Sequence, residues 1–431
     1  MKTNYITEIG YQVPSMFLDR DAALEYLKKA GIKNPNKSIG KLYYLLNHLR
    51  VFPQIKGKRY GNWKGWVTIN KEIIQDLFGN IKYFYFIIKK LEADRLIEID
   101  QSYIIGKQSK KYRLLPVLND DEWKLVKIKI SECNISRKVI EHSMKNWKPI
   151  DHQLYGLLKE FHIDEIEFFE QTTVHNFIEF PGEMRDAILE GYDSSETPVN
   201  RYRFYKRAYD EIRAGEWRYH DPDKYGRRHS NLTNLPKPLR KHLYVFKNGI
   251  QRRLKSVDVV NSHVLLLLTI LPETIESYST FREVVEEGLF YEILPALCAK
   301  SRPDGKYKSY IPEKRKELKK DYFQYVYGNP NLDYVMVSDI YQAMYDYFPE
   351  IHQHIDTLKF SKGYRNPARE MQKAESSIII DYVCTKAANK GLLIAQIYDS
   401  ILCLEEDIEP VKQLMIEGFK TRSLSVNLRI E

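Results

Sequence analysis

The sequence of 431 residues predicts an α+β protein with two or three domains. Segments with apolar residues at helical spacing alternate with short apolar runs of strand character. Hydrophobic residues make up 43% and charged residues 29% of the chain, which is typical of a protein with a folded core and excludes a wholly disordered one.

Nothing in the sequence predicts a membrane span, a signal peptide or a disulfide framework. No run of about eighteen apolar residues occurs, and the first residues, MKTNYITEIGYQVPSMF, lack an apolar core segment. The four cysteines (Cys133, Cys298, Cys384 and Cys403) lie far apart and form no C-x-x-C pair. We therefore expect a cytoplasmic protein with free thiols and no membrane partner.

The charge of the chain is distributed unevenly. Its 67 basic and 58 acidic residues give a net charge of +9. Residues 160–196 hold eleven acidic residues and one basic residue, a net charge of −10, so the remainder carries +19. This positive remainder and the 32 tyrosines, whose rings can stack on bases, indicate a nucleic-acid partner. Codon usage in an AT-rich genome is an alternative source of the composition, but it does not explain the clustering.

The first part of the chain predicts a leader followed by a winged helix. Residues 1–37 suggest a partly ordered leader with a helix near 21–30. Residues 38–117 then give a helix, a short strand, two helices and a β-hairpin with a basic tip, which is the order of elements in a winged helix. These elements are expected at 38–52, 66–69, 71–78, 81–96 and 96–116.

The predicted winged helix favours duplex DNA as its partner. Its last helix, at 81–96, would lie in the major groove, and Gly106–Lys111 would form the wing. The expected phosphate contacts are Lys82, Lys89, Lys90, Lys107, Lys110 and Lys111. A winged helix that contacts only proteins is the alternative. Residues 118–225 follow as a mostly helical connector, whose acidic segment is expected to face solvent or a basic part of the same protein.

Two carboxylates distinguish residues 226–431. Asp258 lies in the apolar segment SVDVVNSHVLLLL, directly after a run at 237–255 with seven Lys or Arg and no acid. Asp399 interrupts the apolar segment LLIAQIYDSILCLEED, which predicts a hairpin with the carboxylate at its bend. Partly buried carboxylates beside cations favour a hard metal ion that also binds phosphate. For each residue alone, an apolar strand that merely ends in Asp is the alternative.

The segment 310–329, YIPEKRKELKKDYFQYVYGN, predicts a helix with one functional face. Arg315, Lys319, Phe323 and Tyr327 recur every four residues and therefore share a broad face. Two cations followed by two aromatic rings can hold a triphosphate and stack a base. In isolation, a cationic helix with an aromatic core stripe explains the pattern as well.

Together these features predict two-metal nucleotidyl transfer. Asp258 and Asp399, which are 399 − 258 = 141 residues apart, would hold two Mg²⁺ ions, with Mn²⁺ as an alternative. One ion activates a 3′-hydroxyl and the other stabilises the leaving pyrophosphate. The cationic helix between them in the sequence would bind the incoming triphosphate.

The order of these elements resembles the palm and fingers of family A DNA polymerases and of the related phage-type single-subunit RNA polymerases. The resemblance covers about 206 residues, 226–431. The fingers pattern R-x3-K-x3-F/Y-x3-YG is matched from Arg315 to Gly328. The family's DYSQIE, HDE or HDS, and GR followed by NLQNIP correspond here to DVVNSH, YDS and GR followed by NLTNLP.

The resemblance implies a right-hand polymerase palm with an antiparallel sheet and helical fingers, and it makes the helical connector a candidate for a reduced thumb. It also implies roles for the matching residues. Asp258 and Asp399 would be the metal ligands, and Lys319 would also donate a proton to pyrophosphate. The residues that would bind the nucleotide are Arg315, Lys319, Phe323, Tyr327 and His263. Those that would contact the primer and template are Arg227, Asn234, Arg240 and Gln372.

Two positions depart from the family pattern. His263 stands where the DNA enzymes have the Glu that excludes ribonucleotides, and its bulk favours dNTP use. Tyr398 replaces the usual His before Asp399. We therefore expect a compact DNA-directed DNA polymerase of a phage, plasmid or other mobile element, acting on primer–template DNA and nucleoside triphosphates. A primase or RNA polymerase of the same fold, and a DNA-binding replication initiator with an inactive palm, are the alternatives.

Overall fold

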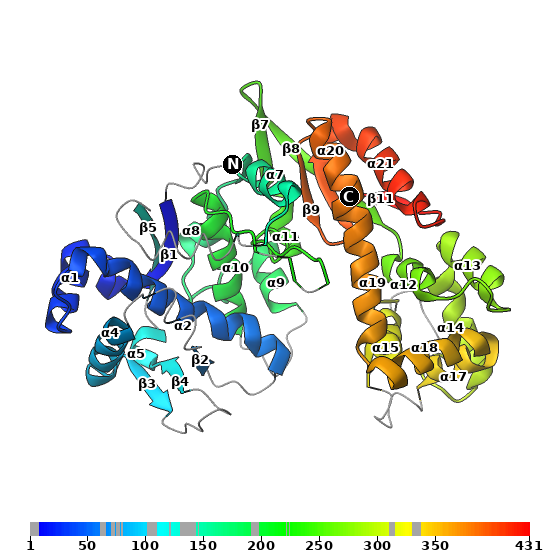
Figure 1. The fold of residues 1–431 in the computed structure, drawn as a ribbon, viewed down its shortest axis with the longest axis horizontal. Helices are drawn as coiled ribbons and strands as arrows, with labels where there is room; N and C mark the ends of the chain where they lie inside the picture. The colour runs from blue at the N-terminus through cyan, green and yellow to red at the C-terminus, as the bar shows by residue number, and fades with distance from the viewer. Residues whose placement is uncertain are drawn as a thin grey trace. The chain divides into compact units, whose positions relative to one another are not determined.

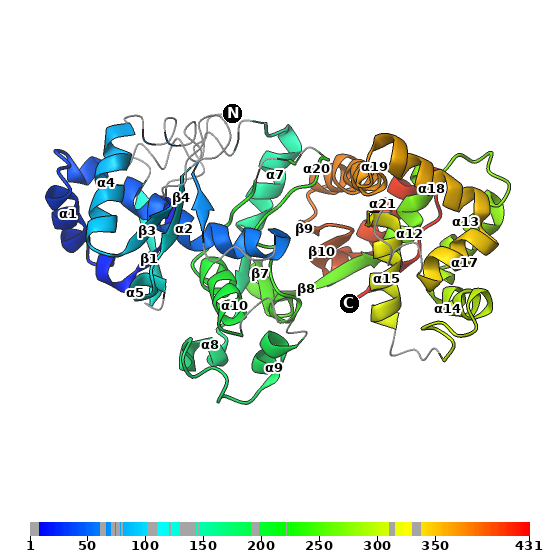
Figure 2. The same ribbon diagram turned by 90° about the horizontal axis from the view of Figure 1, so that it is seen from below.

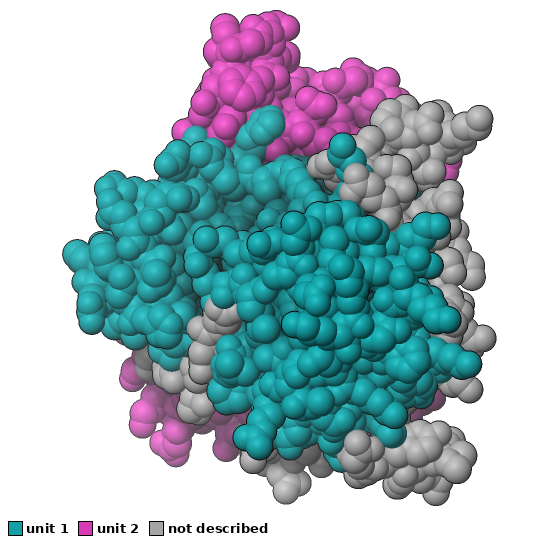
Figure 3. Space-filling view, turned by 90° about the vertical axis from the view of Figure 1, so that its left-hand side faces the viewer, with its two compact units in different colours: residues 1–146, 162–218, 234–242 teal, residues 147–161, 219–233, 243–431 magenta. Residues whose placement is uncertain are grey.

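The computed structural model describes residues 8–60, 66–69, 74, 78, 81–100, 110–119, 122–129, 144, 146–190, 198–220, 222–223, 225–309, 315–329 and 338–431. The chain forms two compact units, which Figure 3 colours separately. Unit 1 comprises residues 1–146, 162–218 and 234–242, and unit 2 comprises residues 147–161, 219–233 and 243–431. Helices and strands occur in both units, so the predicted α+β class is confirmed.

The N-terminal part of unit 1 contains two small sheets and the helices that pack on them. β1 (Glu8–Pro14) pairs antiparallel with β5 (Trp123–Lys129). A second sheet has the order β2 (Val67–Thr68), β4 (Lys111–Leu114) and β3 (Ile97–Asp100). The helices are α1 (Arg20–Lys29), α2 (Ile39–Tyr60), α4 (Ile81–Ala93) and α5 (Pro116–Asn119).

The sequence explains these elements well. Asp19 caps α1 by accepting a hydrogen bond from the Asp21 amide at 2.7 Å. Apolar residues at helical spacing on α2 and α4 lie in one core, among them Leu42, Leu46, Phe84 and Ile88. Helix, strand, helix and hairpin strands therefore occur in the predicted order. Most of the predicted helix at 71–78 and of the predicted wing lies outside the described residues, and the β1–β5 pair was not predicted.

The remainder of unit 1 is mostly helical, as expected. It holds α8 (Glu167–Gln171), α9 (Glu183–Leu189), α10 (Pro198–Arg213) and α11 (Lys237–Arg240), while β6 (Phe161–Ile163) spans the passage of the chain from unit 2 into unit 1. Acidic side chains of the 160–196 segment pair with basic ones of the same unit: Glu165 with Arg213 at 3.0 Å, and Glu183 with Lys241. This segment therefore does face basic residues of its own chain.

An antiparallel sheet forms the centre of unit 2 (Figure 1). β7 (Leu243–Lys247), β8 (Ile250–Val259), β10 (Ser400–Leu404) and β9 (Ile394–Ile397) are neighbours in that order, and β11 (Leu428–Ile430) also pairs with β8. Residues 257 and 258 pair with both β10 and β11, so these two strands lie on opposite edges of β8. The whole of β10 is buried, because the sheet is covered on both faces there.

Helices complete unit 2. They are α7 (Pro149–Leu158), α12 (Ser262–Leu267), α13 (Tyr278–Glu286), α14 (Phe290–Ser301), α15 (Arg315–Tyr327), α17 (Asp339–Tyr347), α18 (Pro349–Lys362), α19 (Asn366–Ser376), α20 (Thr385–Asn389) and α21 (Ile408–Lys420). A π-helical segment, Ser377–Cys384, joins α19 and α20 into one long helix, drawn in orange in Figure 1. Its first part, α19, contacts α12, α15 and α18 (Figure 2). Among the described helices, none has the length and hydrophobicity needed to cross a bilayer.

A buried ion pair fastens α7 into unit 2. The Asp151 side chain is fully buried, and the Arg228 side chain is 2% exposed. Arg228 donates from Nε to Asp151 Oδ1 at 2.7 Å, and the Tyr219 hydroxyl donates to the same oxygen at 3.1 Å. The Lys148 amide donates to Oδ2 at 2.8 Å, so Asp151 also caps the first turn of α7. The charge of Asp151 is thus satisfied entirely by groups of unit 2.

Candidate active site

The sheet of unit 2 brings the two predicted metal ligands together. A two-residue loop, Tyr398–Asp399, joins β9 to β10, and Tyr398 has the left-handed φ of 56° that such tight hairpins favour. Ser400, the next residue, lies directly opposite Asp258 of β8. Asp399 therefore lies beside Asp258, although 141 residues separate them, and the predicted hairpin with a carboxylate at its bend is confirmed.

The electrostatics around Asp258 favour a cation. Burial raises the pKa of its carboxyl, and the negative charge of Asp399 raises this pKa further. Mg²⁺ sites at phosphate-transfer centres use one or two carboxylates and take their other ligands from water and phosphate. Asp258 and Asp399 fit that donor set. Within the described part of the chain, no group of three or more His, Cys, Asp or Glu side chains is arranged to enclose a metal.

The predicted functional face of α15 is also present. Arg315, Lys319, Phe323 and Tyr327 are all partly exposed, whereas four residues of the same helix are fully buried: Leu318, Tyr322, Tyr325 and Val326. The cations and aromatic rings that recur every four residues therefore lie on a different face of α15 from its buried residues. This separation argues against the interpretation of α15 as a structural helix alone.

The two cations on the predicted functional face of α15 lie against one aromatic ring. The Arg315 guanidinium carbon and the Lys319 Nζ lie 5.9 and 5.1 Å from the centre of the Tyr291 ring. Burial lowers the pKa of Lys319, and the charges of Arg315 and Arg429 lower it further, while Asp258 and Asp399 act in the opposite direction. Lys319 is therefore within electrostatic reach of both carboxylates. Nothing in the sequence pattern indicated Tyr291, because it lies on α14, outside the α15 motif.

His263 connects α12 to the aromatic end of α15. Its Nδ1 lies 2.8 Å from the Tyr327 hydroxyl, and its ring packs edge-on against Phe323 at 4.5 Å between centres. Burial lowers the pKa of His263, so the imidazole is neutral at pH 7. Asn261, with a left-handed φ of 54°, directly precedes α12 and accepts a hydrogen bond from Arg315 at 3.3 Å. Of the five residues predicted to bind the nucleotide, His263, Phe323 and Tyr327 thus form one contiguous group.

Arg227 is held by a carboxylate that the sequence analysis missed. Its guanidinium donates to both oxygens of Glu375, at 2.9 and 2.6 Å, and lies 5.4 Å from the centre of the Tyr398 ring. Gly226 precedes it with φ 84°, and a side chain there would approach the Cβ of Ser376 to 3.2 Å. Glu375 lies three residues after Gln372 on α19, so helical spacing from Gln372 was the signal that could have identified it.

Not every predicted site residue joins this group. Asp258, Asp399, His263, Arg227, Gln372 and the four residues of α15 all belong to unit 2. Asn234 and Arg240 belong to unit 1, where the Arg240 Nε donates to the Leu235 carbonyl at 3.0 Å. Their predicted contact with primer and template therefore remains a prediction.

The Arg227–Glu375 pair gives a pH-dependent stability. Burial raises the pKa of Glu375 from 4.5 to about 6, against the opposing effect of Arg227. Between these values the folded protein holds a proton that the unfolded chain has lost, so raising the pH through this window lowers the free energy of unfolding by at most about 2 kcal/mol. Urea unfolding between pH 4 and 7 should show this decrease in the wild type and lose it in Glu375→Gln. If the free energy of unfolding depends on pH in the same way in the wild type and in Glu375→Gln, Glu375 is not the group responsible.

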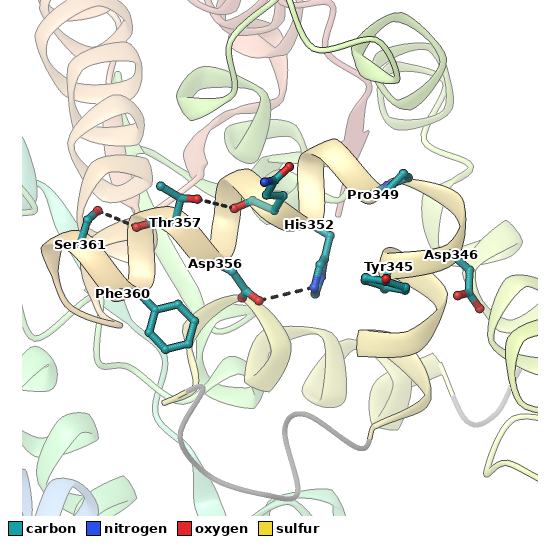
Figure 4. A pocket seen from close by; sticks show the side chains of 9 residues that line it. Tyr345, Asp346, Pro349, His352, Asp356, Thr357, Phe360 and Ser361 are labelled. Atoms are coloured by element: carbon teal, nitrogen blue, oxygen red, sulfur yellow. Dashed lines mark hydrogen bonds and ion pairs between the residues drawn. The ribbon is translucent and has the colours of Figure 1, made fainter.

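A surface hollow of about 1050 Å³ lies elsewhere in unit 2, along α17 and α18 (Figure 4). Tyr345, His352, Asp356 and Phe360 line it, and His352 Nε2 lies 3.4 Å from Asp356 Oδ2. His352 Nδ1 is also 3.0 Å from the Tyr325 hydroxyl, so this imidazole has partners at both nitrogens. None of the predicted site residues lines the hollow.

No model of a protein family matches the sequence, and no curated protein matches it. Among solved structures, the chain is similar to the POL domain of Pol1 from M. smegmatis, in complex with DNA primer-template and dNTP. The TM-score is 0.44 and the sequence identity 12%, over 69% of this chain and 71% of that one. We therefore base the assignment of function on the residues of unit 2.

Proposed function

We propose that the protein is a small DNA-directed DNA polymerase whose nucleotidyl transfer takes place in unit 2. The observation that carries the proposal is the pairing of β8 with β10, which brings Asp258 beside Asp399 within electrostatic reach of Lys319. Two adjacent carboxylates and a nearby cationic–aromatic helix are the components that two-metal phosphoryl transfer needs.

Each side chain has a defined task in this mechanism. Bound Mg²⁺ supplies charge neutralisation for the attacking 3′-hydroxyl and the leaving pyrophosphate. Asp258 and Asp399 hold the metal, and Arg315 and Lys319 bind the phosphates of the incoming nucleotide. The lowered pKa of Lys319 makes its ammonium a better proton donor to pyrophosphate. Phe323 and Tyr327 contact the base and sugar, and Arg227 contacts the primer terminus.

His263 is proposed to favour deoxyribonucleotides. Its ring is held between the Tyr327 hydroxyl and the Phe323 ring, so it occupies a fixed position beside the nucleotide pocket. His263→Ala is expected to improve rNTP incorporation relative to dNTP incorporation by about tenfold, a difference of about 1.4 kcal/mol. The ratio of kcat/KM for a matched dNTP and rNTP measures this. An unchanged ratio would assign the choice of sugar to other residues.

We propose duplex DNA as the partner of the predicted winged helix in unit 1. Lys82, Tyr85, Phe86 and Lys89 occupy one face of α4 at helical spacing, and all four are exposed. Two exposed aromatic rings between two cations suit contact with phosphates and bases. Lys90 pairs with Asp94 at 2.6 Å and Lys111 with Asp100 at 3.6 Å, so these two predicted phosphate contacts are already neutralised in part.

Extension of a labelled primer on a single-stranded DNA template tests the proposed function. The full chain is incubated with Mg²⁺ and either dNTPs or rNTPs, with and without the primer. Primer-dependent growth with dNTPs supports the DNA polymerase. Products from rNTPs without primer would instead identify a primase or RNA polymerase, and template binding without any product would favour a replication initiator with an inactive palm.

A further inference from the structure

Arg429 contacts the proposed metal ligand Asp258, yet it lies outside every motif discussed above. On β11 it is directly opposite Asp258 of β8, so the two side chains share one face of the sheet. The Arg429 Nη2 donates to Asp258 Oδ2 at 2.9 Å and lies 2.7 Å from Glu431 Oε1. Its side chain is 58% exposed. A solvent-exposed guanidinium thus hydrogen-bonds to the carboxylate oxygen that a metal ion would use.

The metal and the guanidinium compete for this position. A Mg²⁺ ion on Asp258 Oδ2 faces a positive charge at hydrogen-bonding distance from the same oxygen, and the two cations repel each other. Because Arg429 is largely exposed, its ion pair with Asp258 is weak and yields to the metal at small cost. The displaced guanidinium then needs another anion.

The incoming nucleotide provides that anion. Arg429 and Arg315 both lower the pKa of Lys319, so the three cations lie in one electrostatic neighbourhood around the carboxylates. Guanidinium groups bind phosphate oxygens in a bidentate manner. We propose that Arg429 neutralises Asp258 in the absence of metal and moves to the triphosphate of the nucleotide when metal and nucleotide bind. This inference rests on the proposed function and adds a third phosphate-binding cation to it.

The variant Arg429→Gln distinguishes this movement of Arg429 from a purely structural role. The affinities for metal and for nucleotide should change in opposite directions. Mn²⁺ binding without nucleotide, followed by electron paramagnetic resonance, should become two- to fivefold tighter, since the competing cation is gone. Binding of Mg²⁺–dNTP to a complex with a dideoxy-terminated primer should weaken about tenfold, since a charged hydrogen bond is lost. Neither measurement requires turnover.

Arg422→Gln is the matched control. Arg422 is an exposed arginine of unit 2 whose Nη2 donates to Ser377 Oγ at 3.2 Å, so neither affinity should change. Arg429→Lys keeps the positive charge but loses the bidentate hydrogen bonds of a guanidinium. Its dNTP affinity should fall between those of the wild type and Arg429→Gln. If Arg429→Gln weakens the binding of both Mn²⁺ and dNTP, or of neither, the proposed movement of Arg429 is wrong while the proposed function stands. If the wild type binds neither Mn²⁺ nor dNTP, both proposals fail together.

Discussion

Replacing Asp399 with asparagine is expected to reduce nucleotide incorporation by about a thousandfold, because it removes one of the two carboxylates proposed to hold the metal. A loss of several kcal/mol in transition-state stabilisation corresponds to this factor. The substitution preserves the size of the side chain, so the tight loop Tyr398–Asp399 and its pairing with β8 should persist. Single-nucleotide incorporation with a labelled primer, together with a thermal melt, measures both properties.

The control for this experiment is Asp346→Asn. Asp346 is an exposed carboxylate of α17 that accepts a hydrogen bond from Gln342 at 2.8 Å, away from the predicted site residues in the sequence. Its variant should retain wild-type incorporation. If Asp399→Asn keeps more than about a tenth of the activity, the metal-ligand role of Asp399 is wrong.

Asp151→Asn is expected to lower the free energy of unfolding by about 3 kcal/mol. The change leaves the Arg228 guanidinium buried without its counter-charge. The asparagine also keeps only one of the two oxygens that accept from the Tyr219 hydroxyl and the Lys148 amide, so one of these donors loses its acceptor. Breaking one half of a buried pair in this way is costly, because the remaining charge stays desolvated. Urea unfolding followed by tryptophan fluorescence gives the free energy directly.

Asp381→Asn provides the comparison, because Asp381 pairs with Lys148, whose backbone amide donates to Asp151. The Asp381 carboxylate is 45% exposed and lies 3.4 Å from the Lys148 ammonium, so its loss should cost less than about 1 kcal/mol. If Asp151→Asn and Asp381→Asn unfold at the same urea concentration, the buried ion pair contributes no more to stability than the surface pair.

Local patterns predicted the most informative parts of unit 2. The recurrence of cations and aromatic rings every four residues identified a face of α15 that is not buried in the core. The interruption of an apolar segment identified the hairpin bend at Asp399. Both features depend on residues that are neighbours in the sequence, where helix and strand periodicity act directly. In unit 1, the helices predicted near 21–30 and at 38–52 occur at 20–29 and 39–60, so the second helix continues eight residues beyond its predicted end.

Contacts between distant segments could not be predicted in this way. Arg429 reaches Asp258 only because β11 pairs with β8, and Arg227 meets Glu375 across 148 residues. The partner of Arg228 is Asp151, which lies in a separate segment of the same unit. Hydrophobic patterning states which face of an element is buried but not which element covers it.

The pairing of β8 with β11 also sets the order in which the site can form during synthesis. Arg429 follows Asp258 by 171 residues in the chain. At translation rates of about 5–20 residues per second, roughly 9 to 34 s pass between the two. Until β10 is synthesised, 400 − 258 = 142 residues after Asp258, β8 has neither β10 nor β11 beside Asp258, so its edges are open to non-native pairing. The nascent chain therefore holds Asp258 on an incompletely paired β8 until β10 and β11 have been synthesised.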